Sequence, residues 1–301
     1  MIDKKHLFNK TIIRSYDIRG IYNKTLFDLD AKIIGNLFGL KVGKNQNVNI
    51  AYDGRLSSES LKNELVEGLL EVGVNVTEIG LSPTPLLYFS CIKNNAAGGI
   101  MITGSHNPKH HNGFKFVFNN MPFYGDDLIK LSEKAKGFSF KRNRGKKIKQ
   151  CFKDEYIDRI FKGINLKNKY RIAWDAGNGV AGELMSKIAK KINNQNFLLF
   201  ENVDGNFPNH HPDPSNPKNL KDCINLIIQE KLDLGIAFDG DGDRIGVIDD
   251  KGRVLSGDQL LLLFSYEILK KKKGAKIIGD VKCSQILFDE IKKKLGIPII
   301  S

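Results

Sequence analysis

A unit made of an apolar run, a helix-type pattern and a second apolar run occurs three times along the chain. The first copy has its runs at 48–52 and 74–79, and the same plan returns at 170–200 and at 276–300. Such units are typical of strand, helix and parallel strand, and they recur in α/β sheets. The repeat therefore predicts three similar α/β domains, with mixed sheets flanked by helices.

The helix of the first copy has a recognisable start and an apolar face. Ser57 and Ser58 carry the hydroxyl groups that commonly cap helix N-termini. Leu61, Leu65 and Leu69 recur at every fourth position, so they share one side of a helix. We expect this side to pack against the sheet.

A polar turn with the sequence TGSHNP, at 103–108, follows the apolar run at 99–102. Ser105 stands beside Gly104 and ahead of Pro108, two residue types that end a strand. Its hydroxyl is expected at the carboxyl edge of the sheet, where it can react. A lone serine in a turn more often satisfies a nearby backbone group, so a chemical role depends on a second motif.

That second motif is DGDGDR, at 239–244, which follows the apolar run at 234–238. Asp239, Asp241 and Asp243 place three carboxylates within five residues. At about 5 Å and an effective dielectric of about 20, each pair repels by about 3 kcal/mol, so a cation is expected. Oxygen ligands without histidine or cysteine predict magnesium.

Two other interpretations of this loop exist. A calcium-binding EF-hand needs glycine at the sixth position and glutamate at the twelfth, between two helices. Here Arg244 and Asp250 occupy those positions and the loop follows a strand, which disfavours the EF-hand. A solvated acidic turn stays open as an alternative.

The two motifs, in this order, resemble the phosphoserine loop and the metal loop of the α-D-phosphohexomutases, most closely the bacterial phosphomannomutase/phosphoglucomutase branch. The similarity extends along nearly the whole chain through SYDIRG at 15–20, DGRLS at 53–57, PTP at 83–85, NGFK at 112–115, DGNFPNHHPDP at 204–214 and DVKCS at 280–284. The resemblance implies reversible interconversion of hexose 1-phosphate and hexose 6-phosphate, with mannose and glucose as the sugars. A hexose 1,6-bisphosphate is the implied intermediate and activator, and Mg²⁺ is the implied cofactor.

The resemblance also implies a role for individual residues. Ser105 carries the phosphoryl group, and Arg19, His106 and Lys115 are its catalytic neighbours. The implied ligands of magnesium are Ser105, Asp239, Asp241 and Asp243, and the implied substrate-binding residues are Tyr16, Arg244 and Lys282.

Local patterns add two expectations about these segments. Asn112 and Gly113 have the sequence of a turn that leads into a strand, and Lys115 alternates there with phenylalanines, so it is expected on the opposite, open face. Asp53 and Arg55, at the end of the first repeat's strand, are interpreted as structural.

Three domains are expected, at 1–145 with the phosphoserine loop, at 146–252 with the metal loop, and at 253–301 as the start of a third. The chain therefore resembles the N-terminal portion of a longer enzyme. As given, it is expected to bind magnesium and to turn over hexose phosphates poorly.

The net charge of +13 raises the question of nucleic-acid binding. Much of the excess lies at 141–149 and 270–273, where aromatic residues for base stacking are missing, so solvated surface is favoured over nucleic acid. A positive field also favours the capture of anionic sugar phosphates. No apolar run is long enough for a membrane span, and a cytoplasmic monomer is expected.

Further alternatives concern the cysteines, two histidines and the substrate. The cysteines are far apart and are expected as free thiols, and they are Cys91, Cys151, Cys223 and Cys283. His210 and His211 suggest zinc, but no third ligand is suitably spaced, so a structural loop is favoured. Phosphoglucosamine mutase and a phosphosugar-binding module without turnover stay open as functions, although the former usually carries SASHNP where this chain has TGSHNP.

Overall fold

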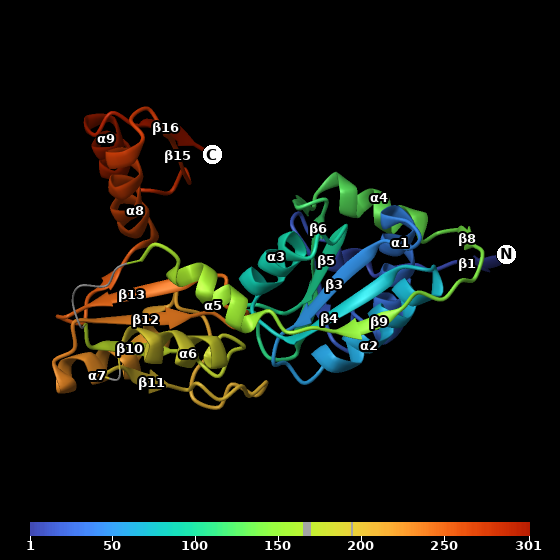
Figure 1. Cartoon of the computed structure of the whole chain (residues 1–301), viewed down its shortest axis with the longest axis horizontal. Helices are drawn as coiled ribbons and strands as arrows, with labels where there is room; N and C mark the ends of the chain where they lie inside the picture. Colours follow the sequence, from blue (N-terminus) through green and yellow to red (C-terminus); the bar gives the residue numbers. More distant parts are fainter. Residues whose placement is uncertain (165–169, 194) are drawn as a thin grey trace.

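The computed structural model describes residues 1–164, 170–193 and 195–301 of the chain, and these residues form two large sheets and two small ones (Figure 1). The first large sheet has the strand order β2-β6-β5-β3-β4-β9, with β7 beside β6. Its strands are β2 (Ile18–Ile21), β3 (Asn47–Tyr52), β4 (Asn75–Leu81), β5 (Gly98–Ile102), β6 (His111–Phe118), β7 (Met121–Phe123) and β9 (Lys147–Lys149). A short antiparallel pair joins β1 (Ile2–Lys4) to β8 (Phe138–Phe140).

Helices cover both faces of the first sheet. They are α1 (Asp28–Val42), α2 (Ser58–Glu71), α3 (Thr84–Lys93) and α4 (Asp126–Lys134), and a 3-10 turn lies at Lys10–Ile12. Side chains alternate along a strand, so Ile100 and Ile102 pack in the core formed with α1 and α2, whereas Met101 packs in a second core with α3. The first sheet is thus the middle layer of three.

The second sheet has the order β11-β10-β12-β13-β14. Its elements are β10 (Ile172–Asp175), β11 (Phe197–Leu199), β12 (Leu234–Phe238), β13 (Ile245–Asp249), β14 (Val254–Leu255), α6 (Gly182–Ile192), a 3-10 turn (Pro217–Leu220) and α7 (Lys221–Glu230). Ala173 packs with residues of α7 on one face, and Trp174 packs with residues of α6 on the other. Helix α5 (Lys153–Phe161) lies between the two sheets along the chain and contacts both α3 and α6.

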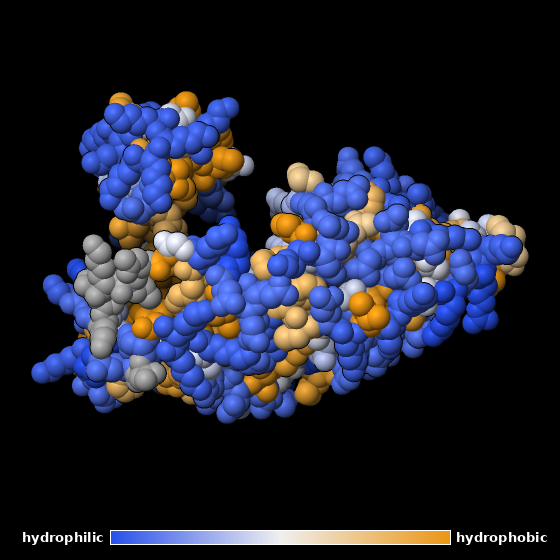
Figure 2. Space-filling view, in the orientation of Figure 1, coloured by the Kyte–Doolittle hydropathy of each residue, from blue (hydrophilic) through white to orange (hydrophobic). Residues whose placement is uncertain are grey.

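A smaller third unit projects from the second sheet in Figure 1. It contains α8 (Gly257–Lys271), β15 (Lys276–Gly279), α9 (Gln285–Lys293) and β16 (Ile297–Ile300), and β15 and β16 pair in parallel. Figure 2 shows a mostly hydrophilic surface, with hydrophobic side chains gathered on the side of this unit that faces the first sheet. Within the described residues, no helix is both long enough and apolar enough to cross a bilayer.

The predicted repeat is confirmed as three parallel strand pairs, β3 with β4, β10 with β11, and β15 with β16. Two local expectations were wrong. Asn112 and Gly113 lie inside β6 and pair with β2, because Gly113 allows a close approach in which a Cβ would meet the carbonyl oxygen of Ile18 at 1.9 Å. Ser57 precedes α2 but makes no capping hydrogen bond, since its hydroxyl and that of Ser58 accept from the Asn112 side chain instead.

The first sheet continues beyond residue 145, where the first domain was expected to close. Strand β9 pairs with β4 at Val76 and Lys147, so the end of the basic segment, at 147–149, forms the edge of the sheet. We propose that the first domain extends through β9 and that α5 begins the second.

Candidate active site

Both predicted loops lie where the strand order of a sheet reverses. In the first sheet, β4 and β5 lie on opposite sides of β3, so the strand order reverses between β3 and β5. In the second sheet, β11 and β12 lie on opposite sides of β10, so the strand order reverses between β10 and β12. Crevices at the carboxyl ends of strands on either side of such a reversal are the usual ligand sites of α/β sheets. The TGSHNP loop follows β5 and the DGDGDR loop follows β12, so each loop occupies such a position.

The hydroxyl of Ser105 lies against the aspartate loop. Its Oγ donates to Oδ2 of Asp239 at 2.7 Å, although the two residues are 134 positions apart in the sequence. His106 Nδ1 lies 3.2 Å from the same Oγ. The backbone of Ser105 is left-handed, with φ of 50°, which a residue other than glycine adopts rarely and which marks a constrained position.

The three aspartates form a compact cluster. One side-chain ligand atom from each of Asp239, Asp241 and Asp243 lies within 4.8 Å of the others, and the first two side chains are buried. Oδ1 of Asp239 accepts from the backbone N–H groups of Asp243 and Arg244, both at 3.0 Å. Oδ1 of Asp241 is buried and has no hydrogen-bond partner. A buried carboxylate oxygen without a partner is costly, so this cluster is built to receive a cation.

Lys115 supplies one positive charge to this cluster. Its Nζ donates to Asp241 at 2.7 Å and to Asp243 at 2.6 Å. Burial lowers the pKa of Lys115, but the two carboxylates outweigh it and raise the pKa above its ordinary value. Burial and repulsion from Asp241 and Asp243 together raise the pKa of Asp239 to about 7. The positive charge of one lysine does not neutralise three carboxylates. Carboxylate oxygens are hard ligands, and together with the unpaired Oδ1 of Asp241 they suit Mg²⁺.

A cavity of about 700 Å³ opens beside Ser105. Its lining contains four cations and two carboxylates, which suits an anionic ligand, and its volume suits a sugar phosphate. The lining residues are Arg14, Tyr16, Asp17, Arg19, Ser105, His106, Asn107, Lys115, Asp243 and Arg244.

Arg19 is held in this cavity by two side chains. One of its terminal nitrogens donates to Oδ1 of Asn107 at 2.9 Å, and the other pairs with Asp17.

Burial, Arg244 and Arg19 lower the pKa of His106, so its imidazole is neutral at neutral pH.

Comparison with known proteins identifies the family. Residues 10–156 match the family described as phosphoglucomutase/phosphomannomutase, alpha/beta/alpha domain I, and residues 154–252 match alpha/beta/alpha domain II. The chain belongs to the phosphoglucomutase/phosphomannomutase family. A phosphoglucomutase of Neisseria meningitidis serogroup B is 40% identical over 292 residues, which are 95% of this chain and 63% of that protein. A phosphomannomutase/phosphoglucomutase of Pseudomonas syringae pv. tomato is also 40% identical, over 96% of this chain and 63% of that protein.

The fold agrees with a solved member of the family. The structure of a phosphoglucomutase/phosphomannomutase family protein from Burkholderia thailandensis superimposes with a TM-score of 0.92 at 38% identity, covering 98% of this chain and 66% of that one. The chain thus spans about 63% of the length of the curated relatives named above.

Most of the site residues expected for a phosphohexomutase come together at this cavity. Asp239 and Asp241 do not line it, because they are fully buried beside it, against Ser105 and Lys115. Lys282 is not in the lining either, because it lies in the loop after β15, where its backbone N–H donates to Asp280. Its substrate-binding role stays a prediction.

Three contributors were missed from the sequence. Arg14 lines the cavity just before the SYDIRG stretch, and Asn107 holds Arg19 from within TGSHNP, so nearness to a motif was the available signal. Thr84 donates its hydroxyl to Asp241 at 2.6 Å, and its place within the PTP stretch at 83–85 was the available signal, although this stretch does not indicate which distant residue Thr84 contacts.

The neighbouring elements exclude one alternative to a magnesium loop. The aspartate loop lies between β12 and β13, not between two helices, which excludes an EF-hand. His210 lies beside Asp175, with Nε2 at 3.0 Å from its Oδ2, and His211 Nε2 donates to the carbonyl oxygen of His106. His211 thus fastens this loop of the second domain to the loop that contains Ser105, whereas His210 fastens it to the end of β10.

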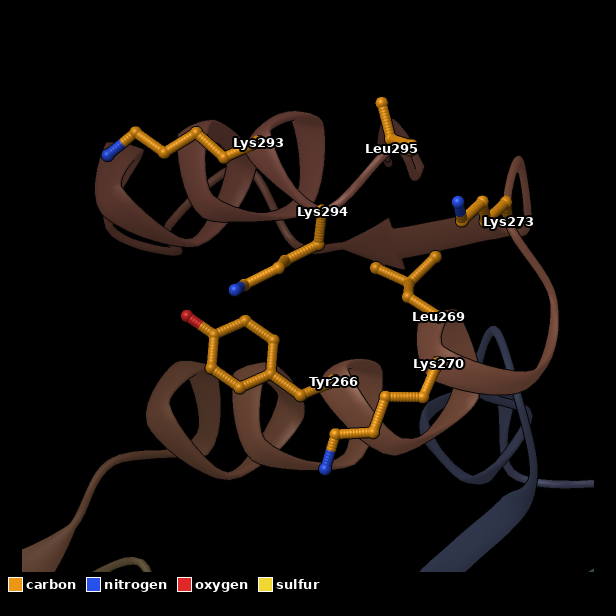
Figure 3. A pocket seen from close by; sticks show the side chains of 7 residues that line it. All are labelled: Tyr266, Leu269, Lys270, Lys273, Lys293, Lys294 and Leu295. Carbon is orange, nitrogen blue, oxygen red and sulfur yellow. The ribbon is translucent and has the colours of Figure 1, made fainter.

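A second cavity, of about 320 Å³, lies between α8 and α9 (Figure 3). Its lysines include Lys270 and Lys293, which pair with glutamates of their own helices, and Lys294, whose Nζ lies 5.5 Å from the Tyr266 ring centroid. Its lining lacks a carboxylate or a nucleophilic hydroxyl other than the Tyr266 phenol, so it offers no phosphoryl-transfer chemistry.

Proposed function

We propose that this chain carries out phosphoryl transfer in the interconversion of hexose 1-phosphate and hexose 6-phosphate, through a phosphoserine at Ser105. Mannose and glucose are the proposed sugars, since the relatives of similar sequence are named for these two. The proposal is carried by one observation, the 2.7 Å contact between Ser105 Oγ and Asp239 of the aspartate cluster.

In the proposed reaction, phospho-Ser105 donates its phosphoryl group to the free hydroxyl of the bound sugar phosphate. A hexose 1,6-bisphosphate forms, the sugar turns around, and the other phosphoryl group returns to the Ser105 oxygen. Each step breaks one P–O bond and forms one, and the proton lost by the attacking hydroxyl is balanced by the proton that the departing oxygen takes up. Such catalysis consists mainly of positioning and charge neutralisation.

The position of each residue in or beside the cavity indicates its proposed role, which is metal binding or charge neutralisation. Asp239, Asp241 and Asp243 are proposed to hold Mg²⁺, together with the Ser105 oxygen. The bound ion would neutralise charge on the transferring phosphoryl oxygens. Arg19 and Lys115 approach from the first domain and add positive charge beside the serine.

The outer part of the cavity is proposed to bind the sugar phosphate. Tyr16 is largely exposed there and its ring lies 5.9 Å from that of Tyr124, so it offers a face for the sugar. Arg14 and Arg244 line the same space and suit the phosphate that does not react.

The test separates phosphorylation from turnover. The purified chain is incubated with glucose 1,6-bisphosphate and Mg²⁺, and intact-mass spectrometry with peptide mapping looks for one phosphoryl group on Ser105. Mutase turnover is then assayed with the 1-phosphates of glucose, mannose and glucosamine. Ser105→Ala is the matched control, since it removes only the hydroxyl.

Phosphorylation at Ser105 in the unmodified chain and none in the variant is the expected result. Binding of hexose phosphates without any phosphoryl transfer would favour a binding module instead. Preferential turnover of glucosamine 1-phosphate would replace the proposed sugars.

A further inference from the structure

The Arg55 side chain lies at the centre of the serine loop, residues 103–111, and each of its five N–H groups donates a hydrogen bond. It follows β3, and none of its side chain is exposed to solvent. A guanidinium has five N–H groups in a planar fork. Nε donates to Asp53, and the two terminal nitrogens donate to the backbone carbonyl oxygens of Pro108 at 2.6 Å, His111 at 3.0 Å, Ser105 at 2.7 Å and Asn107 at 2.7 Å.

Four carbonyl oxygens of one short loop therefore converge on a single cation. Buried carbonyl groups that point toward one another repel and lack partners unless a donor lies between them. The loop also contains the left-handed Ser105 backbone. Gly104 is needed beside the guanidinium, because a Cβ there would meet Cζ of Arg55 at 2.4 Å.

The cation is itself fixed from both domains. Asp53, its partner, also accepts from the hydroxyls of Ser58 at 2.6 Å and Thr103 at 2.8 Å. From the second domain, the Phe207 ring covers it with its centroid 5.3 Å from Cζ of Arg55. The guanidinium thus has little freedom to move or to bind water.

The carbonyl of Ser105 connects this arrangement to the metal loop. Gly240 approaches the same carbonyl so closely that a Cβ on it would meet the Ser105 oxygen at 2.5 Å. Arg55 holds that oxygen from one side and the backbone of the aspartate loop packs against it from the other. The register between serine loop and aspartate loop therefore depends on where Arg55 places this carbonyl.

We propose that Arg55 is a positioning residue for phosphoryl transfer: through four carbonyl groups it fixes the backbone that aims the Ser105 hydroxyl at the aspartate cluster. Within the described residues, its side chain makes no hydrogen bond to the Ser105 hydroxyl or to the carboxylates of that cluster. The inference rests on the proposed transfer at Ser105. Lysine cannot replace the arginine, because an ammonium has three donors and lacks the planar fork.

Arg55→Lys tests this geometry, since it keeps the charge beside Asp53. Arg144→Lys is the matched control, because Arg144 binds Glu67 through both terminal nitrogens on the surface. Two readouts are taken: the single-turnover rate of phosphoryl transfer from glucose 1,6-bisphosphate to Ser105 at saturating Mg²⁺, and hydrogen exchange of the 103–111 segment. The amides of Gly104, Ser105, Asn107 and His111 are hydrogen-bonded there and report loosening.

Arg55→Lys is expected to slow transfer about 100-fold, the effect of misplacing a reacting group by about 1 Å. Exchange should accelerate in the 103–111 segment while the Mg²⁺ dissociation constant and exchange in β10 stay the same. In Arg55→Ala, added methylguanidinium should restore the rate and methylammonium should not. If Arg55→Ala does not fold, the lysine variant alone decides.

The proposal would be overturned if hydrogen exchange of the 103–111 segment in Arg55→Lys were as slow as in the unmodified chain. It would also be overturned if Arg55→Lys transferred the phosphoryl group as fast as Arg144→Lys. Failure of the unmodified chain to phosphorylate Ser105 would overturn the proposed function instead, and the exchange measurement would still decide whether Arg55 holds the loop.

Discussion

The hydroxyl of Thr84 offers a direct measure of how strongly the first domain stabilises the metal loop. It donates to Oδ2 of Asp241 at 2.6 Å, and both side chains are fully buried. Thr84→Val keeps the shape and removes this donor. A hydrogen bond to a charged group contributes about 1.5–3 kcal/mol. Because Lys115 still donates to the same oxygen, we expect a loss of about 2 kcal/mol in the free energy of unfolding.

The assay is urea unfolding followed by circular dichroism, without added metal. Thr77→Val is the matched control, because the Thr77 hydroxyl is equally buried but donates to the uncharged Asn47 side chain at 3.0 Å. That change should cost about 1 kcal/mol. Thr84→Ser should retain most of the stability. Equal losses in the two valine variants would refute the claim that the charge of Asp241 makes the Thr84 contact the stronger one.

Three other outcomes are expected. Ser105→Ala should abolish phosphoryl transfer and leave the circular dichroism spectrum unchanged, because a turn serine contributes little to the core; normal turnover would contradict the assignment. Asp241→Asn should weaken Mg²⁺ binding in calorimetry and phosphoryl transfer together, and an unchanged metal titration would move the metal site elsewhere. Burial raises the pKa of Glu71, but hydrogen bonds from Lys4 and Lys32 outweigh it and lower the pKa from 4.5 to about 2. A lowered folded pKa stabilises the fold above the unfolded value and loses this contribution as the pH falls from about 4.5 to about 2. Glu71→Gln should therefore flatten the dependence of the unfolding free energy on pH in that window, and a parallel shift of the whole curve would count against it.

Local pattern was sufficient for the three parallel strand pairs and for the place of the serine and the aspartates in two loops. The repeat of apolar runs predicted three parallel strand pairs, since alternation and helix periodicity are properties of neighbouring residues. The residue types in TGSHNP and DGDGDR were enough to single out the serine and the three aspartates as candidate site residues. That Ser105 and the aspartates share one metal site was implied by the resemblance, but the direct contact between Ser105 and Asp239 is known only from the structure.

The errors and omissions share a physical cause, which is contact between distant segments. Asn112 and Gly113 have the composition of a turn, yet the close approach of β2 makes a strand of them. Arg55 was interpreted as structural, although it stands at a strand end. Four of its five hydrogen bonds depend on where the 105–111 backbone turns, and that conformation is not encoded by any pattern near residue 55.

Ser105 and the carboxylates that face it belong to separate sheets, and one core of the first sheet also includes Ile157 of α5 and Leu184 of α6. Each domain, produced alone, would present half of the chemistry: a hydroxyl without its acidic partner, or a carboxylate cluster without Lys115. Mixing the two halves would then yield phosphoryl transfer whose initial rate rises with the product of their concentrations. Activity in such a complementation experiment would report how tightly the two bodies dock, without any label on either one.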